Sequence, residues 1–67
     1  MKTMDPREAD EKVLAAVRAG RGTLSEVCAE LELRPNGEDR IADRALQRLR
    51  KAGRIVRSGR PQRWEVV

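Results

Sequence analysis

Apolar residues in the first third of the chain recur at the spacing of an α-helix, in which residues three or four apart share one face. The residues on or beside this face are Ala9, Val13, Leu14, Ala16 and Val17. Asp5 before Pro6 is typical of a helix start, because Asp caps free N–H groups and proline fits the first helical position. Gly20 is a common helix terminator. We therefore expect a helix over residues 6–19, after a short N-terminal tail at residues 1–5.

A second helical pattern follows at once. Thr23 and Glu26 have the spacing of a capping box, in which the two side chains satisfy free N–H groups at a helix start. The apolar stripe behind them consists of Leu24, Val27, Cys28 and Leu31. Pro35 and the Asn36-Gly37 pair favour turns and break the pattern. The sequence predicts a helix over residues 24–32 and a turn after it.

The third pattern is the most informative for function, because its two faces differ so strongly. A helix over residues 38–52, ending before Gly53, places one apolar face inward. This face consists of Ile41, Ala45, Leu46 and Leu49. The opposite face consists of Arg40, Asp43, Arg44, Gln47, Arg48 and Lys51. A charged outer face is usually just solvated, but solvated faces mix the two signs more evenly than this one.

The C-terminal segment, residues 54–67, alternates in the manner of a β-hairpin. Residues 54–57 and 62–67 read as strands, and the Gly and Pro between them favour a turn. Alternation along the second strand puts Trp64 and Val66 on one face, with Ile55 as the inward partner from the first strand. We expect Trp64, the single aromatic residue of the chain, to point into the core.

Composition narrows the class of protein. A chain of 67 residues, 39% of them apolar, is expected to form a single domain at residues 1–67 with a small core. A single cysteine and the lack of a long apolar run favour a soluble, cytoplasmic protein. With no His, no glycine-rich phosphate loop and Cys28 in an apolar helix, we expect no enzyme, no catalytic residue, no cofactor, no metal and no small-molecule ligand.

The charges are divided unevenly along the chain. Residues 1–33 carry five basic and seven acidic residues, a net charge of −2, whereas residues 34–67 carry ten basic and four acidic residues, a net charge of +6. Nine of those ten bases are arginine, whose planar fork suits phosphate and guanine. A division this strong indicates a face that binds a polyanion.

The order of three helices and a basic hairpin resembles a winged helix-turn-helix domain. The resemblance covers about residues 8–67 and rests on the segments KVLAAVRAG, GTLSEVCAEL, RALQRLRKAGRIV and RWEVV. It implies an α+β, mostly helical fold, with the third helix in the DNA major groove and the hairpin wing on the backbone. The segment between Leu33 and Ile41 departs from the family pattern, because its turn is some residues longer than usual.

The wing alone is also similar to that of Zα domains, winged helices that bind left-handed nucleic acid through wing prolines and a tryptophan. Pro61 and Trp64 match that pattern. The family's helix asparagine falls on Asp43 and its tyrosine on Gln47, and loss of the tyrosine removes the stacking partner of the base. Left-handed binding is therefore a subordinate alternative.

The resemblance and the charges together predict binding to double-stranded DNA, by a small transcriptional regulator or a phage or mobile-element accessory factor. Arg40, Arg44 and Gln47 would face base edges, with Asp43 orienting an arginine or accepting from cytosine. The expected phosphate contacts are Arg48, Lys51, Arg57, Arg60 and Arg63. A homodimer or a partner protein on DNA is plausible. The alternatives are a protein–protein interaction module and RNA binding.

Overall fold

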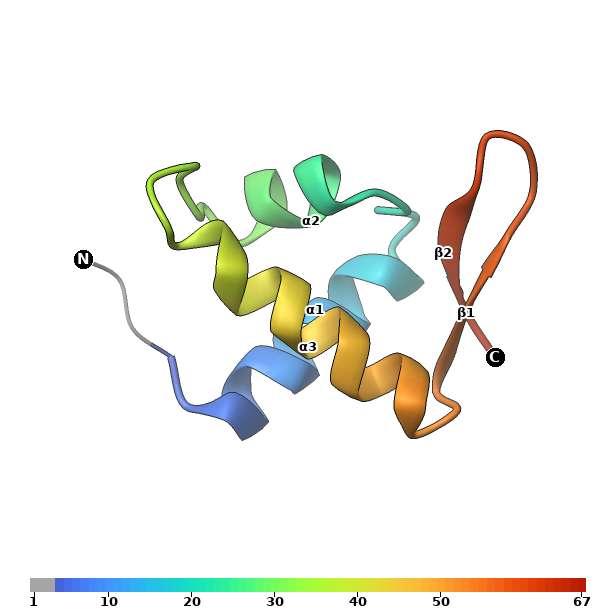
Figure 1. Cartoon of the computed structure of the whole chain (residues 1–67), viewed down its shortest axis with the longest axis horizontal. Helices are drawn as coiled ribbons and strands as arrows, with labels where there is room; N and C mark the ends of the chain where they lie inside the picture. The colour runs from blue at the N-terminus through green and yellow to red at the C-terminus, as the bar shows by residue number, and fades with distance from the viewer. Residues whose placement is uncertain (1–3) are drawn as a thin grey trace.

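The computed structural model describes residues 4–67, which form three helices followed by an antiparallel hairpin (Figure 1). The elements are α1 (Pro6–Arg18), α2 (Leu24–Glu30), α3 (Asp39–Lys51), β1 (Ile55–Ser58) and β2 (Arg63–Val66). The expected fold class, mostly helical α+β with a winged-helix layout, is confirmed. Of the expected N-terminal tail, residues 1–3 lie outside the described part of the chain.

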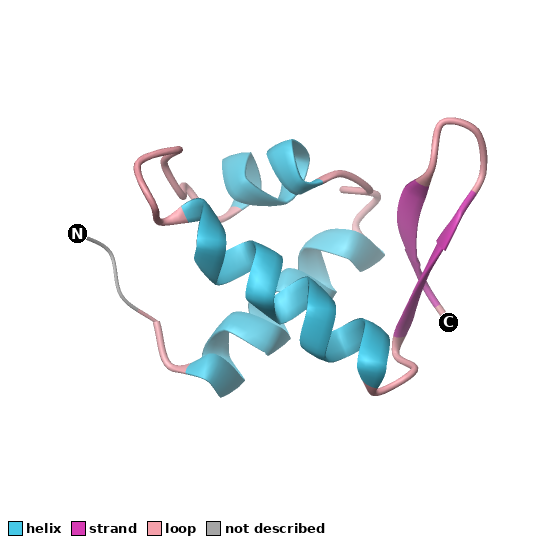
Figure 2. Ribbon diagram, in the orientation of Figure 1, coloured by secondary structure: helices cyan, strands magenta, loops and turns pink. Residues whose placement is uncertain are grey.

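The helices are grouped at one side of the molecule and the hairpin stands at the other, beyond the C-terminal end of α3 (Figure 2). α1 and α3 cross and pack against each other, and α2 covers the same core from a second side. The most deeply buried large side chains come from all three helices and from the hairpin: Val13, Val27, Leu46 and Ile55. The hairpin is therefore part of the core and not an appended arm.

The first two helices begin as their capping residues predict. The Asp5 carboxylate accepts a hydrogen bond from the Arg7 backbone N–H at 2.9 Å, and Pro6 occupies the first turn of α1. The Thr23 hydroxyl accepts from the Glu26 backbone N–H at 3.2 Å at the start of α2. Each cap satisfies a backbone donor that the helix itself leaves without a partner.

The second helix ends at Glu30, two residues before the predicted end. Glu32 adopts a left-handed backbone conformation with φ of 58°, and the Leu33 N–H donates to the Cys28 carbonyl at 2.8 Å. This is the Schellman pattern, in which a left-handed residue reverses the chain and satisfies the last carbonyls. Glycine is the usual residue there, so a glutamate gave no signal in the sequence.

The third helix is one residue shorter at each end than predicted. Glu38 precedes it without capping it; its carboxylate is buried and accepts from the Arg34 backbone N–H at 3.1 Å. The buried face of α3 is turned slightly from the predicted one, because Ala42 is fully buried while Ile41 is only half-buried. Ile41 was placed on the predicted face by helical periodicity, and it lies at the edge of the buried stripe, whereas Ala42 lies within it.

The hairpin pairs Ile55 with Val66 and Arg57 with Trp64. Ser58 lies in β1 and not in the turn, which spans residues 59–62. Trp64 is buried, 8% exposed, so its expected inward orientation is confirmed. Within residues 4–67, no helix combines the length and the apolar character needed to span a bilayer.

Candidate nucleic-acid interface

The outer face of α3 is an exposed, mostly basic surface. Its members are Arg40, Asp43, Arg44, Gln47 and Lys51, all of them exposed and all opposite the buried stripe of the same helix. None of its cations forms an ion pair with another described residue. Unpaired guanidinium and ammonium groups keep their full donor capacity for an external anion.

The wing adds two exposed arginines beside this face. Arg60 lies in the hairpin turn, and Arg57 lies on β1 directly opposite Trp64. The Arg57 guanidinium carbon is 5.1 Å from the centre of the Trp64 ring, within the range of a cation–π interaction. The tryptophan thus packs in the core on one side and orients an arginine on the other.

A hollow of about 280 Å³ joins α3 to the wing. From α3 it is lined by Asp43 and Gln47, and from the hairpin by Arg57 and Gln62, with Trp64 among the apolar residues below. Side chains with amide and guanidinium groups from two elements therefore line one hollow. Gln62 was not among the predicted site residues, because only the folded hairpin brings it opposite Gln47.

Arg48 is not part of this surface in the structure. Its Nη2 atom lies 2.8 Å from the Asp10 Oδ1 atom, and its Nε donates to the same oxygen at 3.0 Å. Arg48 therefore faces α1 and links α3 to it. Asp10 lies 38 residues earlier, so helical periodicity within α3 gave no sign of this pairing.

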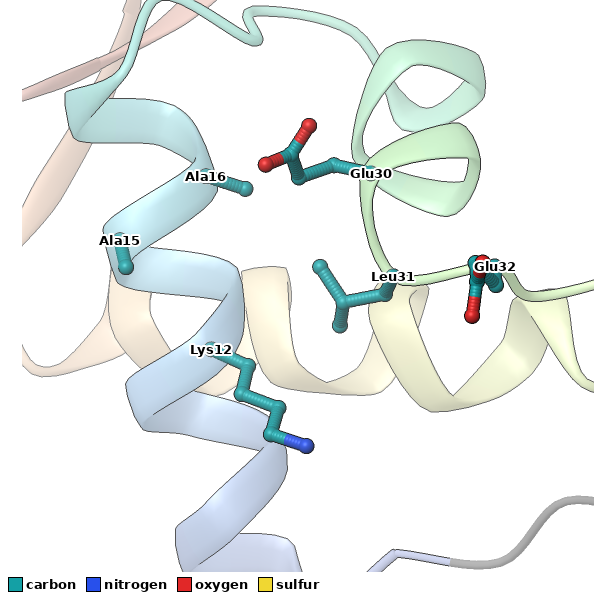
Figure 3. A pocket seen from close by; sticks show the side chains of 6 residues that line it. All are labelled: Lys12, Ala15, Ala16, Glu30, Leu31 and Glu32. Atoms are coloured by element: carbon teal, nitrogen blue, oxygen red, sulfur yellow. The ribbon is translucent and has the colours of Figure 1, made fainter.

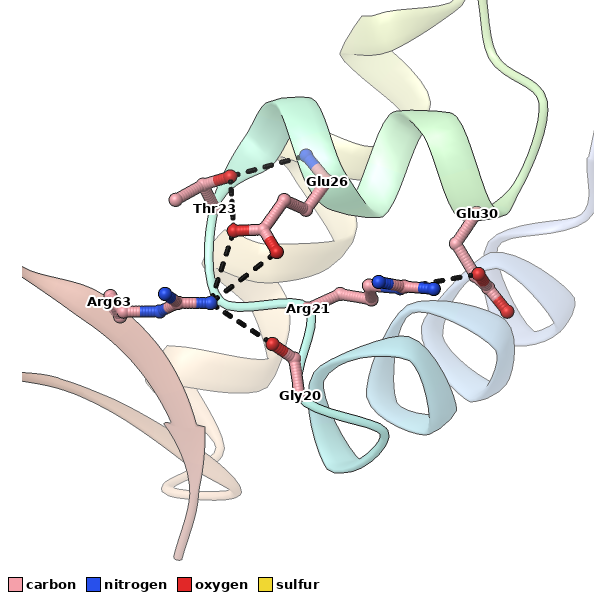
Figure 4. Close-up of polar contacts among 6 residues, drawn as sticks. All are labelled: Gly20, Arg21, Thr23, Glu26, Glu30 and Arg63. Atoms are coloured by element: carbon pink, nitrogen blue, oxygen red, sulfur yellow. Dashed lines mark hydrogen bonds and ion pairs between the residues drawn. The ribbon is translucent and has the colours of Figure 1, made fainter.

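Arg63, the last predicted phosphate contact, is also bound within the molecule. Its Nη2 atom donates to Glu26 Oε1 at 3.1 Å and to the Gly20 carbonyl at 3.1 Å (Figure 4). Of the nine predicted site residues, seven thus present side chains without such partners, and Arg48 and Arg63 connect elements of the fold.

A second hollow lies between α1 and α2, and its chemistry differs from that of the hollow between α3 and the wing. It measures about 350 Å³ and is lined by Lys12, Ala15, Ala16, Glu30, Leu31 and Glu32. Figure 3 shows the Glu30 carboxylate directed from α2 toward α1 above Leu31. Its two carboxylates and single ammonium make it unsuited to a polyanion.

Cys28 is a core residue without an active thiol. It is buried, and its pKa is raised above the usual value, first by burial and then by the negative charges of Asp39 and Asp43. A raised pKa keeps the thiol protonated and unreactive at neutral pH. In the part of the chain that the structure describes, no three His, Cys, Asp or Glu side chains gather as a metal site.

Comparison with protein-family models, curated proteins and solved structures finds no match to this chain.

Proposed function

We propose that the chain binds double-stranded DNA, with α3 in the major groove and the wing along the backbone, as a small transcriptional regulator or accessory factor. The observation that carries this proposal is the exposed α3 face, whose three cations lack an acidic partner among residues 4–67. A helix of 13 residues is about 20 Å long, and the major groove, roughly 12 Å wide, admits a helix.

Base reading would come from the exposed α3 side chains. Arg40 and Arg44 offer the paired donors that match guanine O6 and N7, and the Gln47 amide matches adenine N6 and N7. Asp43 would accept from cytosine or hold a neighbouring arginine in place. It would also repel a phosphate, so α3 must present this part of its face to bases.

Phosphate contacts would come from Lys51, Arg57 and Arg60. The internal ion pairs of Arg48 and Arg63 reduce the number of phosphate contacts expected from the sequence from five to three. Each neutralised phosphate contributes roughly −0.9 to the slope of log K against log salt. The three remaining phosphate contacts therefore predict a slope of about −2.7, against about −4.5 for all five.

A fluorescence-anisotropy titration with a labelled random duplex at several salt concentrations tests the proposal. A slope of about −2.7 supports binding through the free wing and α3 cations. A slope of about −4.5 would show that Arg48 and Arg63 release their internal partners on DNA. A slope near zero rejects the proposal and leaves the protein-interaction alternative, for which an acidic protein surface is the expected partner.

A further inference from the structure

Arg63 connects the wing to two other parts of the fold. It lies on β2, and its guanidinium reaches the Glu26 carboxylate on α2 and the Gly20 carbonyl at the end of α1 (Figure 4). The Glu26 Oε2 atom lies 3.4 Å from the same Nη2 atom, so both carboxylate oxygens face it. One arginine head group therefore joins β2, α2 and the link between α1 and α2.

The acidic partner is held in place independently. The Thr23 hydroxyl donates to Glu26 Oε1 at 3.1 Å and accepts from the Glu26 backbone N–H at 3.2 Å. Thr23 and Glu26 thus present a carboxylate whose position the start of α2 determines. We call the set Arg63, Glu26 and Thr23 the wing anchor.

Beside the wing anchor, the backbone of β2 also lies close to the link between α1 and α2. The Trp64 N–H donates to the Gly22 carbonyl at 2.8 Å. A Cβ atom at Gly22 would lie 2.5 Å from Arg63 Nε and 2.9 Å from Arg63 Cβ. Only glycine lets β2 approach the link this closely.

We propose that the wing anchor sets the position of the wing relative to α3, and that Arg63 is a positioning residue for DNA binding and not a phosphate contact. The inference rests on the proposed DNA binding. Thr23 of the anchor lines the same hollow as Gln47 of α3 and Arg57 and Gln62 of the wing. Holding β2 on α2 therefore fixes the spacing between the wing donors and the α3 donors.

The variant Glu26→Gln distinguishes a purely electrostatic role of Glu26 from an anchoring role, because the two roles predict opposite changes in DNA affinity. Removing a negative charge strengthens DNA binding if Glu26 acts only through long-range electrostatics. If the anchor positions the wing, the same change weakens binding, by up to about fivefold for an exposed ion pair. Glu30→Gln is the matched control, because Glu30 is on the same helix and pairs with Arg21 outside the anchor; its binding should be unchanged or slightly tighter.

A charge exchange separates positioning from direct contact. In Glu26→Arg combined with Arg63→Glu the ion pair is reversed at constant net charge. A positioning role predicts that Glu26→Arg raises affinity more in the Arg63→Glu background than in the native background, because only there does it restore an ion pair. If Arg63 is a phosphate contact, the added charge of Glu26→Arg raises affinity equally in both backgrounds. Circular dichroism checks that each variant is folded, and Glu26→Asp, which shortens the side chain and keeps its charge, is the second test should Glu26→Gln unfold.

Coupling to the wing tip completes the test. In the native background Arg60→Gln should weaken duplex binding, and in the Glu26→Gln background it should weaken binding less, because an unanchored wing no longer holds Arg60 at the backbone. Equal losses in the two backgrounds, or tighter binding by Glu26→Gln, overturn the inference while leaving DNA binding intact. If the native chain shows no salt-dependent duplex binding, the proposed function itself fails, and the inference with it.

Discussion

Three interactions hold Trp64 in place: packing in the core, a contact with Arg57 and a backbone hydrogen bond. The residue is 8% exposed in the core, Arg57 lies 5.1 Å from the centre of its ring, and its backbone N–H donates to the Gly22 carbonyl. A small core depends heavily on one large side chain, because few other residues bury as much apolar area. The side chain is thus a structural residue that also orients a wing arginine.

We predict that Trp64→Ala lowers the free energy of unfolding by about 3–5 kcal/mol. A chain of 67 residues has roughly 3–10 kcal/mol of stability in total, so the variant should be largely unfolded at 37 °C. Urea denaturation followed by circular dichroism measures the loss. Val56→Ala, at an exposed position of β1, is the control and should change little. A Trp64→Ala protein as stable as the native chain would contradict this structural role.

Two arginines four residues apart on α3 should behave differently. Arg44 has no acidic partner among the described residues, whereas Arg48 is paired with Asp10. We predict that Arg44→Ala costs about 1–3 kcal/mol of binding at one base position. Arg48→Ala should change DNA affinity little and lower stability by at most about 1 kcal/mol, since both partners are partly exposed.

A set of duplexes with single base-pair changes distinguishes these outcomes by anisotropy. Loss of discrimination at one position identifies Arg44 as a base contact. An equal loss on every duplex would make Arg44 a phosphate contact, and a large loss for Arg48→Ala would show that Arg48 leaves Asp10 when DNA binds.

At the scale of elements, local signals in the sequence were sufficient to predict the type and order of the helices and strands. Caps at Asp5 and Thr23, glycines at helix ends and two-residue alternation in the hairpin each act within a few residues. The interactions that the sequence did not reveal join distant segments: Arg48 to Asp10 and Arg63 to Glu26. The exposed α3 face followed from periodicity alone, whereas the role of each arginine depends on which acid the fold brings beside it.

The left-handed backbone conformation at the end of α2 can be tested by substitution. Glu32 has a φ of 58°, a left-handed conformation that costs a residue with a Cβ atom roughly 1–2 kcal/mol and costs glycine almost nothing. Glycine loses more entropy on folding, which offsets part of this gain. We therefore predict that Glu32→Gly stabilises the chain by about 0.5–1 kcal/mol. Glu30→Gly, inside the helix, should destabilise it by about 1 kcal/mol. Urea denaturation of both variants checks the opposite signs; destabilisation by Glu32→Gly would contradict the left-handed assignment.

At the scale of the molecule, the fold separates the two charge classes of the chain. The half with a net charge of −2 forms α1 and α2, and the half with a net charge of +6 forms α3 and the wing. The exposed acids of α1 and the carboxylates of the α1–α2 hollow would face away from a bound polyanion. Electrostatic steering would then orient the protein before contact as well as attract it.

This orientation predicts where duplex DNA perturbs the protein. In an amide chemical-shift titration with a random duplex, shifts should concentrate at residues 40–51 and 57–62, because these segments carry the exposed donors of α3 and the wing. Residues 8–16 of α1 should stay nearly unshifted, which provides an internal control in the same spectrum. Raising the salt concentration should reverse the shifts, because counterions compete with phosphate contacts. Shifts centred on α1 or on the α1–α2 hollow would contradict both the orientation and the proposed interface.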